Sequence, residues 1–358
     1  PPIQVDGYDL GQIQTEISNV LGRYRNTTWW VNLTCGSKVM SLGAYEAAKL
    51  HPGTSVWYLD SNHRQVISLQ GNPPGGDVFR LTVSEYLTAY RRMPMKTSDD
   101  PFFPKKLALA ELFFNQSEKI AVLKKLLGSQ NAESGTQDQY STLKLPTSDR
   151  WIIQACQMAK EANLIQSLSS GFEFLTLKVI GHDFWKFVNG TWFEFIVWNA
   201  ARKAGCFDDV KMDVEIPGKF GLNQLDLAAT FSANLLIAEC KTDANPFRSK
   251  ASKERLAEQQ KTNPGYRPDP EKIEESGTAY LDKLNSVSSL IGGSFVTKVF
   301  ICTANPPNPQ KNPGLYKTYE QFCSQAVERQ IVIVTGDQLH QLPAILHREG
   351  KNPTYPRT

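Results

Sequence analysis

The chain has 358 residues, enough for two or three domains. Hydrophobic residues make up 41% of it and charged residues 21%, the composition of an ordinary globular protein and not of a disordered or fibrous one. Its formal net charge of +3 is too small to indicate nucleic-acid binding by itself, so any site for a polyanion must be a local patch.

The cysteines and histidines give no sign of a zinc site or a disulfide framework. The six cysteines are scattered without a Cys-x-x-Cys pair, and the five histidines form no His-x-x-x-His pair. This usage favours free thiols in a reducing cytoplasm. No apolar run approaches the length of a membrane span, so we expect no membrane partner. The chain begins Pro1-Pro2 without a methionine, and we expect residues upstream of Pro1 to be missing.

Residues 1–92 alternate helical and strand patterns, which predicts an α/β domain. A stop signal, His51-Pro52-Gly53, closes the second helix. The expected elements, in chain order, are helix Gly11–Gly22, strand Thr28–Leu33, helix Val39–Leu50, strands Ser55–Asp60 and Gln65–Gln70, strand Val78–Val83 and a short helix ending at Arg91.

Residues 93–171 are predicted to connect two domains. The stretch 93–105 is rich in proline and is typical of a linker, and 106–170 has the apolar spacing of helices. Residues 172–358 again alternate helices and strands. The expected elements there are helices Thr191–Ala204, Ser276–Ile291, Lys317–Arg329 and Asp337–His347, and strands Val210–Ile216, Leu222–Phe231, Leu235–Lys241, Lys298–Thr303 and Ile331–Val334.

A charged insertion, Asp243–Glu275, interrupts this last region. It has four basic residues within Arg248–Arg255, which could contact substrate phosphates. A solvated loop explains the same composition, and we slightly favour that interpretation.

Two neighbouring apolar strands carry the most informative residues, Asp226, Glu239 and Lys241. Strand side chains alternate between faces, so Glu239 and Lys241 point the same way. A tight turn at 232–234 makes the strands a hairpin that brings Asp226 beside them. Burying unpaired charge is costly, and a divalent cation, which prefers carboxylate oxygens, would account for the acids.

The helix before these strands supplies a third acid. Thr191–Ala204 is apolar almost all round, and Glu194 is its only acidic residue. A lone buried glutamate would bind a proton unless a cation lay nearby. Lys241, beside two carboxylates, should stay protonated. The alternative for Glu194 is a structural role, in which the helix dipole stabilises an acid near the helix start. The alternative for Glu239 and Lys241, taken without their context, is an ordinary ion pair on the surface.

A helix followed by three strands that carry Glu, then Asp, then Glu-x-Lys resembles the PD-(D/E)xK nuclease superfamily. The resemblance implies that Asp226 and Glu239 ligate Mg²⁺ or Mn²⁺ and that Glu194 holds a second metal or a metal-bound water. It implies that Lys241 orients the water and stabilises the phosphorane. Relatives usually have an acid two residues before the aspartate, whereas this chain has Gln224, which leaves the number of metal ions open.

A second candidate site lies in the first domain, where a strand, a loop and a helix follow one another. The loop consists of Thr34, Cys35, Gly36, Ser37 and Lys38. Glycine, a helix N-terminus and a lysine together favour an anion site. The loop lacks the upstream glycine and the Ser or Thr after lysine of a Walker A loop, so ATP hydrolysis is not expected. The alternative is a helix cap with a solvated Lys38.

The run Val31–Ala44 resembles the ligand loop of CARF domains, the Rossmann-like sensors of cyclic oligoadenylates in type III CRISPR defence. Cys35 replaces a glycine of that loop and Ser37 a threonine. The first half of a CARF domain is not recognisable, and we expect it to lie upstream. Asn189–Glu194 and Gly221–Thr242 resemble segments of the CRISPR ancillary nucleases that these sensors control.

The fold predicted from both resemblances is α/β: a Rossmann-like CARF domain (1–92), a helical connector (93–171) and a PD-(D/E)xK nuclease domain (172–358). They imply a metal-dependent endonuclease of antiviral defence, a homodimer that a cyclic oligoadenylate, most commonly cyclic tetra-adenylate, activates allosterically. The substrate can be DNA or RNA, single- or double-stranded. The alternatives are a restriction or repair nuclease without ligand control, an inert sensor and a ligand-gated transcriptional regulator.

Overall fold

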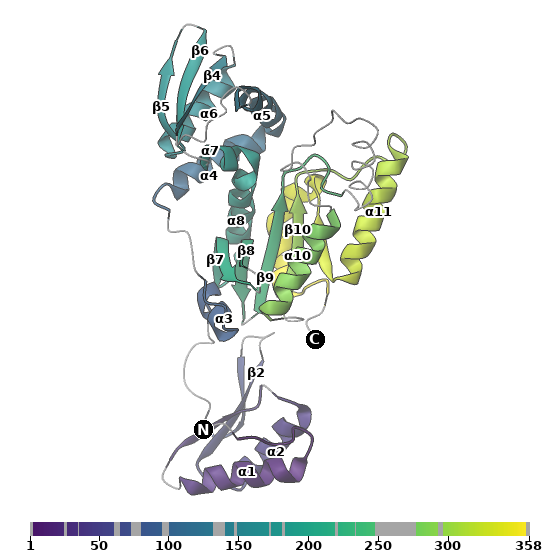
Figure 1. The fold of residues 1–358 in the computed structure, drawn as a ribbon. Helices are drawn as coiled ribbons and strands as arrows, with labels where there is room; N and C mark the ends of the chain where they lie inside the picture. Colours follow the sequence, from purple (N-terminus) through teal and green to yellow (C-terminus); the bar gives the residue numbers. More distant parts are fainter. Residues whose placement is uncertain are drawn as a thin grey trace. The chain divides into compact units, whose positions relative to one another are not determined.

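The computed structural model describes residues 3–24, 27–34, 36–60, 65–72, 80–94, 100–131, 140–146, 149–171, 173–180, 183–218, 221–232, 234–247, 277–292 and 296–355. The chain divides into two compact units, Pro1–Arg80 and Leu81–Thr358. Figure 1 draws both units, coloured along the sequence. Within the described residues, every helix is too short or too polar to cross a bilayer.

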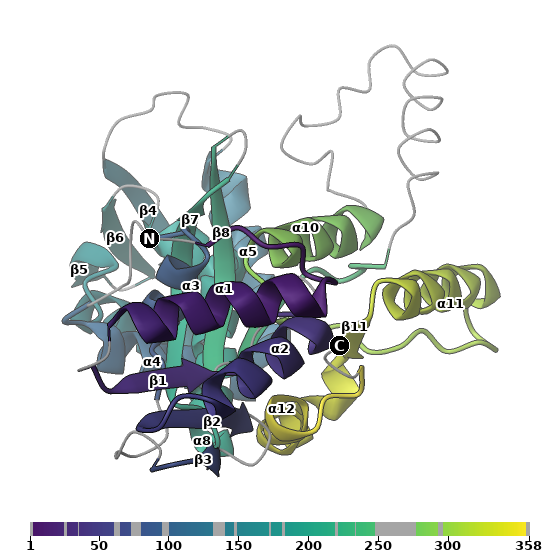
Figure 2. The same ribbon diagram turned by 90° about the horizontal axis from the view of Figure 1, so that it is seen from below.

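The first unit is a three-stranded sheet with two helices. β1 (Trp29–Asn32) pairs in parallel with β2 (Thr54–Asp60), which pairs antiparallel with β3 (Gln65–Gln70). Helices α1 (Leu10–Arg23) and α2 (Lys38–Lys49) lie side by side, as Figure 2 shows. The core of this unit comprises Leu21, Leu33, Ala48 and Val56. All five elements agree with those predicted, within a few residues at the ends.

Helix α3 (Val83–Ala89) belongs to the second unit. Thr82 caps it, and Val83, Tyr86 and Leu87 enter a core that the second unit forms. The Thr230 hydroxyl also donates a hydrogen bond to the Leu81 carbonyl at 2.5 Å. The division therefore falls before Leu81, whereas the sequence analysis ended the first domain at residue 92.

The prediction of a strand at Val78–Val83 is wrong for the residues that the structure describes, 80–83. Residues 73–79 lie outside the described residues, 80–82 form no strand, and Val83 begins a helix. The physical reason is a capping box: the Thr82 hydroxyl accepts a bond from the Glu85 N–H, and the Glu85 carboxylate accepts one from the Thr82 N–H. That exchange satisfies backbone donors at a helix start.

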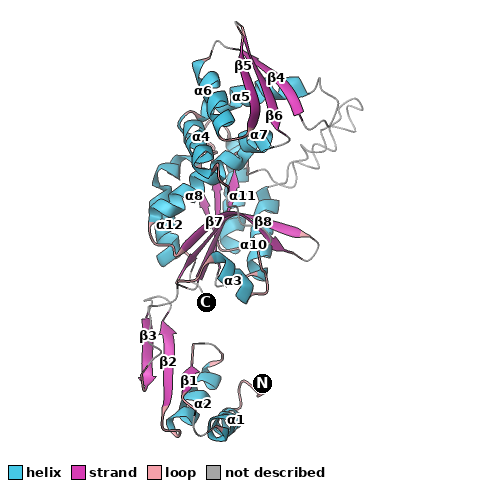
Figure 3. Ribbon diagram, turned by 90° about the vertical axis from the view of Figure 1, so that its left-hand side faces the viewer, coloured by secondary structure: helices cyan, strands magenta, loops and turns pink. Residues whose placement is uncertain are grey.

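The segment after α3 is helical, as predicted, but it also contains a sheet that was not. Its helices are α4 (Phe103–Asn115), α5 (Ser117–Asn131) and α6 (Arg150–Glu161). Strands β4 (Tyr140–Pro146), β5 (Ile165–Ser170) and β6 (Phe174–Ile180) form an antiparallel sheet in the order β4-β6-β5 (Figure 3). Apolar residues alternate along these strands, which is typical of a strand with one buried face. The buried ones include Leu143 with Leu145 and Leu175 with Leu177. This alternation was not recognised in the sequence.

Helix α4 starts inside the stretch predicted to be a linker. Pro104 lies in its first turn, where a missing N–H breaks no helical bond. The β5–β6 hairpin likewise crosses the predicted boundary at residues 171/172. The proline-rich stretch is thus, from Phe103 onward, the start of a helix.

The central sheet of the second unit has five strands in the order β11-β10-β9-β8-β7. Strands β7 (Asp209–Pro217), β8 (Leu222–Phe231) and β9 (Asn234–Lys241) form an antiparallel meander. Strands β10 (Val296–Cys302) and β11 (Ile331–Val334) continue it in parallel. These are the five strands predicted for this region.

Helices cover both faces of this sheet (Figures 1 and 2). One core contains α8 (Trp192–Ala204), α12 (Leu342–Lys351) and alternate residues of β9 such as Ala238. The other contains α10 (Gly277–Leu290), α11 (Pro313–Glu328) and the intervening residues of β9 such as Ile237. Short turns of helix lie at α7 (Asp183–Lys186), η1 (Phe187–Thr191) and η4 (Gly336–Gln341).

The insertion is described only over residues 243–247. Its basic stretch Arg248–Arg255, and with it the expected contact with phosphates, lies outside the described residues.

Candidate functional site

The β8–β9 hairpin brings the two signature acids to one level of the sheet. Its paired residues run from Phe231 opposite Asn234 to Leu227 opposite Ala238. Asp226 and Glu239 are the next residues on either strand. The hairpin predicted from the sequence therefore places both acids together at the end of an apolar sheet.

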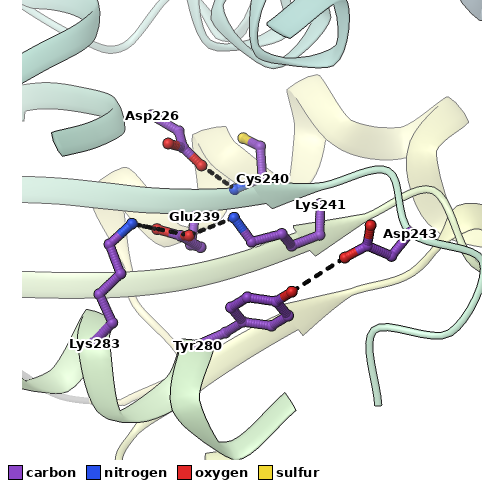
Figure 4. Close-up of polar contacts among 7 residues, drawn as sticks. All are labelled: Asp226, Glu239, Cys240, Lys241, Asp243, Tyr280 and Lys283. Atoms are coloured by element: carbon purple, nitrogen blue, oxygen red, sulfur yellow. Dashed lines mark hydrogen bonds and ion pairs between the residues drawn. The ribbon is translucent and has the colours of Figure 1, made fainter. Parts of the chain in front are cut away.

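The Asp226 carboxylate is buried, with 6% of the residue exposed. Its Oδ2 accepts a hydrogen bond of 2.7 Å from the Cys240 N–H (Figure 4). Burial, followed by the nearby charge of Glu239, raises the pKa of Asp226 to about 6, although Lys241 and the hydrogen bond from Cys240 act in the opposite direction. Part of the population is therefore protonated near neutral pH, and a cation beside the carboxylate would favour its ionised form.

Glu239 lies between two ammonium groups, as Figure 4 shows. The Lys241 Nζ is 2.6 Å from its Oε1, and the Lys283 Nζ of helix α10 is 3.1 Å from Oε1 and 3.0 Å from Oε2. The Glu239 side chain is only 3% exposed, against 22% for Lys241 and 35% for Lys283. Two cations thus shield one buried carboxylate from the solvent.

Lys241 is held as an ammonium. Burial by itself disfavours its charge, but Glu239 and Asp226 outweigh burial and raise the pKa of Lys241 above its ordinary value. The ammonium lies 4.8 Å from the centre of the Tyr280 ring, a favourable cation–π contact. The Tyr280 hydroxyl in turn donates to Asp243 Oδ2 at 3.2 Å. Lys241 is therefore suited to stabilising negative charge and not to accepting a proton.

Glu194 faces the same cavity from the first turn of α8. Burial raises the pKa of Glu194 well above its ordinary value, and the charges of Asp226 and Asp213 add to that rise. Asn189, just before α8, accepts hydrogen bonds through its carbonyl from Thr242 Oγ1 at 2.8 Å and from Lys124 Nζ at 3.2 Å. The bond from Thr242 holds the segment before α8 against the end of β9, and the bond from Lys124 joins it to α5.

Asp213 is a fourth acid, which the sequence analysis did not single out. Its backbone has φ 52, in the left-handed region, within strand β7. Its Oδ1 accepts a 2.7 Å hydrogen bond from the Gln224 side-chain amide. The Asp213 carboxylate of β7 thus lies beside Gln224 of β8, the position at which PD-(D/E)xK nucleases usually have an acid. The two residues meet only through the pairing of β7 with β8, which the sequence does not show.

These groups line a cavity of about 960 Å³ in the second unit. The lining includes Glu194, Asp213, Gln224, Asp226, Lys241, Asp243, Tyr280 and Lys283. Glu239 is not among the described residues that line it. Across the described ranges, no three His, Cys, Asp or Glu side chains are grouped closely enough to hold a metal ion as they stand. The described lining of the cavity therefore contains both acids and lysines.

The raised pKa of Asp226 predicts how stability depends on pH. Between its unfolded pKa near 3.8 and its folded pKa of about 6, the folded state retains a proton that the unfolded state has lost. Stability without metal should therefore fall as pH rises through this window, and Glu194 acts in the same direction. Thermal denaturation in EDTA between pH 4.5 and 7.5 measures the slope, which Asp226→Asn should flatten. Parallel profiles for the two proteins would contradict the assignment.

In the first unit, the candidate loop is organised around two hydroxyl groups. The Thr34 hydroxyl donates to Asn32 Oδ1 at 2.6 Å and accepts from the Leu59 N–H at 2.8 Å, which ties β1 to β2. The Ser37 hydroxyl caps α2 by accepting from the Met40 N–H at 3.1 Å. Ser37 therefore acts as the helix cap that the sequence analysis kept as an alternative.

The remaining loop residues are Gly36, Lys38 and Cys35. Gly36 has φ 101, a conformation that favours glycine, and is exposed. Lys38 is the first residue of α2 and is also exposed. Cys35 lies outside the described residues. An exposed glycine and an exposed lysine at a helix N-terminus retain the features of an anion site.

Two family models match the sequence. Residues 1–86 match the Card1 CARF domain, and residues 182–256 match the Card1-like endonuclease domain. The first part of the chain therefore resembles the Card1 CARF domain, and a later part resembles the Card1-like endonuclease domain. This confirms the family predicted from the Val31–Ala44 loop and the Glu239–Lys241 signature.

Two solved structures resemble the whole chain. Protein VC1899 from Vibrio cholerae is 19% identical with a TM-score of 0.65, and the match covers 99% of this chain and 84% of that one. Can2 from Sulfobacillus thermosulfidooxidans, solved in complex with cyclic tetra-adenylate, is 20% identical with a TM-score of 0.57, covering 96% and 82%. At these identities the likeness shows the fold alone, which is the mixed α/β fold predicted. Among curated proteins, none matches the sequence.

Proposed function

We propose that this protein is a divalent-metal-dependent nuclease that a cyclic oligoadenylate activates in type III CRISPR defence. The observation that carries the proposal is that Glu194, Asp226 and Lys241 line one cavity and that Lys241 is paired with the buried Glu239 behind it, in a chain that matches both a CARF model and an endonuclease model. The structure of Can2 with cyclic tetra-adenylate supports that ligand as the activator.

The donor set fits a hard cation such as Mg²⁺ or Mn²⁺. Asp226 is buried and Glu194 partly buried, and each carboxylate raises the energy of the other when ionised, so a cation between them would relieve that repulsion. We assign the metal to Asp226, Glu194 and Glu239, the last after one of its two lysines has moved away. When bound, such a cation activates water and neutralises charge on a phosphate. We assign to the carboxamide of Gln224, which donates a hydrogen bond to Asp213, the binding of a metal-bound water.

Lys241 and the CARF loop have separate roles in this proposal. Lys241, a permanent ammonium on the cavity wall, stabilises the charge that develops on the scissile phosphate. The Thr34–Lys38 loops of two subunits bind one two-fold ligand on the axis of a homodimer, because a symmetric ligand suits an isologous interface. Activation follows if the ligand prefers the dimer that cleaves. A cytoplasmic location remains a prediction from the cysteines.

A cleavage panel tests the proposal. Supercoiled plasmid and labelled single- and double-stranded DNA and RNA are incubated with Mg²⁺, Mn²⁺ or EDTA, each with and without cyclic tri-, tetra- and hexa-adenylate. We expect cleavage only with a divalent metal and strong stimulation by one cyclic oligoadenylate, cyclic tetra-adenylate first. Metal-dependent cleavage that no cyclic oligoadenylate changes would instead support a restriction or repair nuclease. Ligand binding without any cleavage would support an inert sensor.

A further inference from the structure

Lys283 of helix α10 has no role in the chemistry assigned so far, although it is bonded to a signature residue. Its Nζ contacts both carboxylate oxygens of Glu239, at 3.1 and 3.0 Å. It also lines the cavity, which Glu239 itself does not. The sequence motif could not indicate it, because α10 follows β9 only after the insertion.

Two ammonium groups share the Glu239 carboxylate. Lys241 lies 2.6 Å from it, the shortest contact in the cluster, and Lys283 lies 3.0 Å from it. Asp226 is close enough to interact with both lysines, but the direct contacts of Lys283 are with Glu239. Lys283 therefore shares its contacting carboxylate with a second lysine while it faces the cavity, where a substrate phosphate would be a further partner.

The three charges differ in their freedom to move. The Lys283 side chain is 35% exposed, the Lys241 side chain 22% and the Glu239 side chain 3%. The Lys283 contacts are also the longer ones. Lys241 is further held by the Tyr280 ring at 4.8 Å, from the same helix as Lys283. Lys283 is therefore the group that can leave Glu239 for an anion in the cavity.

We propose that Lys283 is a phosphate-contacting residue: in the substrate complex its ammonium turns from Glu239 to a non-bridging oxygen of the nucleic-acid backbone. This frees one side of the Glu239 carboxylate while Lys241 keeps it ionised. Lys283 then contributes both to binding the substrate and to stabilising charge at the scissile phosphate. The inference rests on the proposed nuclease activity.

The test compares Lys283→Met and Lys283→Arg with a matched variant, Lys298→Met. Lys298 also bonds α10, through Asn285 at 2.9 Å, but is not among the described residues lining the cavity. Binding of a fluorescein-labelled oligonucleotide that the wild type cleaves is measured by anisotropy in Ca²⁺ at several salt concentrations. Cleavage of the same oligonucleotide is measured in Mg²⁺ or Mn²⁺.

For Lys283→Met we expect cleavage to fall about 10- to 100-fold and the slope of log affinity against log salt to decrease by about 0.7 to 0.9, the loss of one phosphate contact. Lys283→Arg should retain most of the cleavage rate and most of the salt slope, and Lys298→Met should change neither quantity. An unchanged salt slope in Lys283→Met, whatever its rate, would overturn the phosphate contact. If the wild type itself neither binds nor cleaves nucleic acid, the proposed nuclease function is wrong. That result differs from a wild type that cleaves while Lys283→Met keeps its salt slope, which contradicts only the role of Lys283.

Discussion

Replacing Glu239 by glutamine is expected to reduce cleavage by roughly 100- to 1,000-fold, the range seen when one preorganised electrostatic group is removed from an active site. Glutamine has the same shape but no charge, so it removes both a metal ligand and the anion that Lys241 and Lys283 share. Single-turnover cleavage with saturating activator and Mn²⁺ measures the effect. Binding of the cyclic oligoadenylate should be unchanged.

The same substitution should also destabilise the fold, so activity has to be compared per folded molecule. Removing one partner of a fully buried ion pair costs about 3–5 kcal/mol, and the loss here should be smaller because both lysines are partly exposed.

Glu349→Gln is the matched control. Glu349 is also fully buried, bonds the Thr354 N–H at 2.8 Å, and is not among the described residues lining the cavity. It should lower stability and leave cleavage intact. Equal cleavage by Glu239→Gln and Glu349→Gln would refute a catalytic role for Glu239.

The sequence located the signature because the information for it is local. Strand alternation put Glu239 and Lys241 on one face, and a short turn placed Asp226 beside them. The buried helix around Glu194 was equally visible from composition alone. The family predicted from these residues agrees with the two family models that match the chain.

The residues that the sequence did not reveal are those brought in by tertiary packing. Asp213 meets Gln224 only because β7 pairs with β8, and Lys283 meets Glu239 only because α10 packs on β9. Neither contact has a fixed spacing in the sequence. The sheet at 140–180 was missed for another reason: its strands alternate apolar and polar residues in short runs, which can be mistaken for the apolar spacing of neighbouring helices.

Activation by the ligand and cleavage of the substrate can be tested separately. The residues proposed to hold the metal and to contact phosphate lie in the second unit, and the candidate ligand loop lies in the first. A substitution in the loop should therefore change how much activator is needed, without changing the chemistry at saturation.

Lys38→Ala is the substitution for which we expect the largest effect on activation. Lys38 is exposed at the N-terminus of α2, where its charge and the backbone N–H groups favour a phosphate. A hydrogen bond to a charged group contributes about 1.5–3 kcal/mol, which corresponds to roughly a 10- to 100-fold change in affinity. The cyclic tetra-adenylate concentration for half-maximal cleavage should rise by that factor. The maximal rate and its metal dependence should stay the same, since no loop residue lines the cavity in the described part of the chain.

Lys49→Ala controls for the loss of a lysine from the same helix. Lys49 is exposed near the opposite end of α2 and pairs with Glu46 at 3.3 Å, a surface ion pair that contributes little to stability. Because cations are favoured at a helix C-terminus and phosphates at its N-terminus, Lys49 should not contact the activator. If Lys38→Ala and Lys49→Ala show the same activation curve as the wild type, the Thr34–Lys38 loop is only the cap of α2, and the activator binds elsewhere or not at all. If only Lys38→Ala shifts the curve, the loop senses the ligand and the second unit cleaves in response.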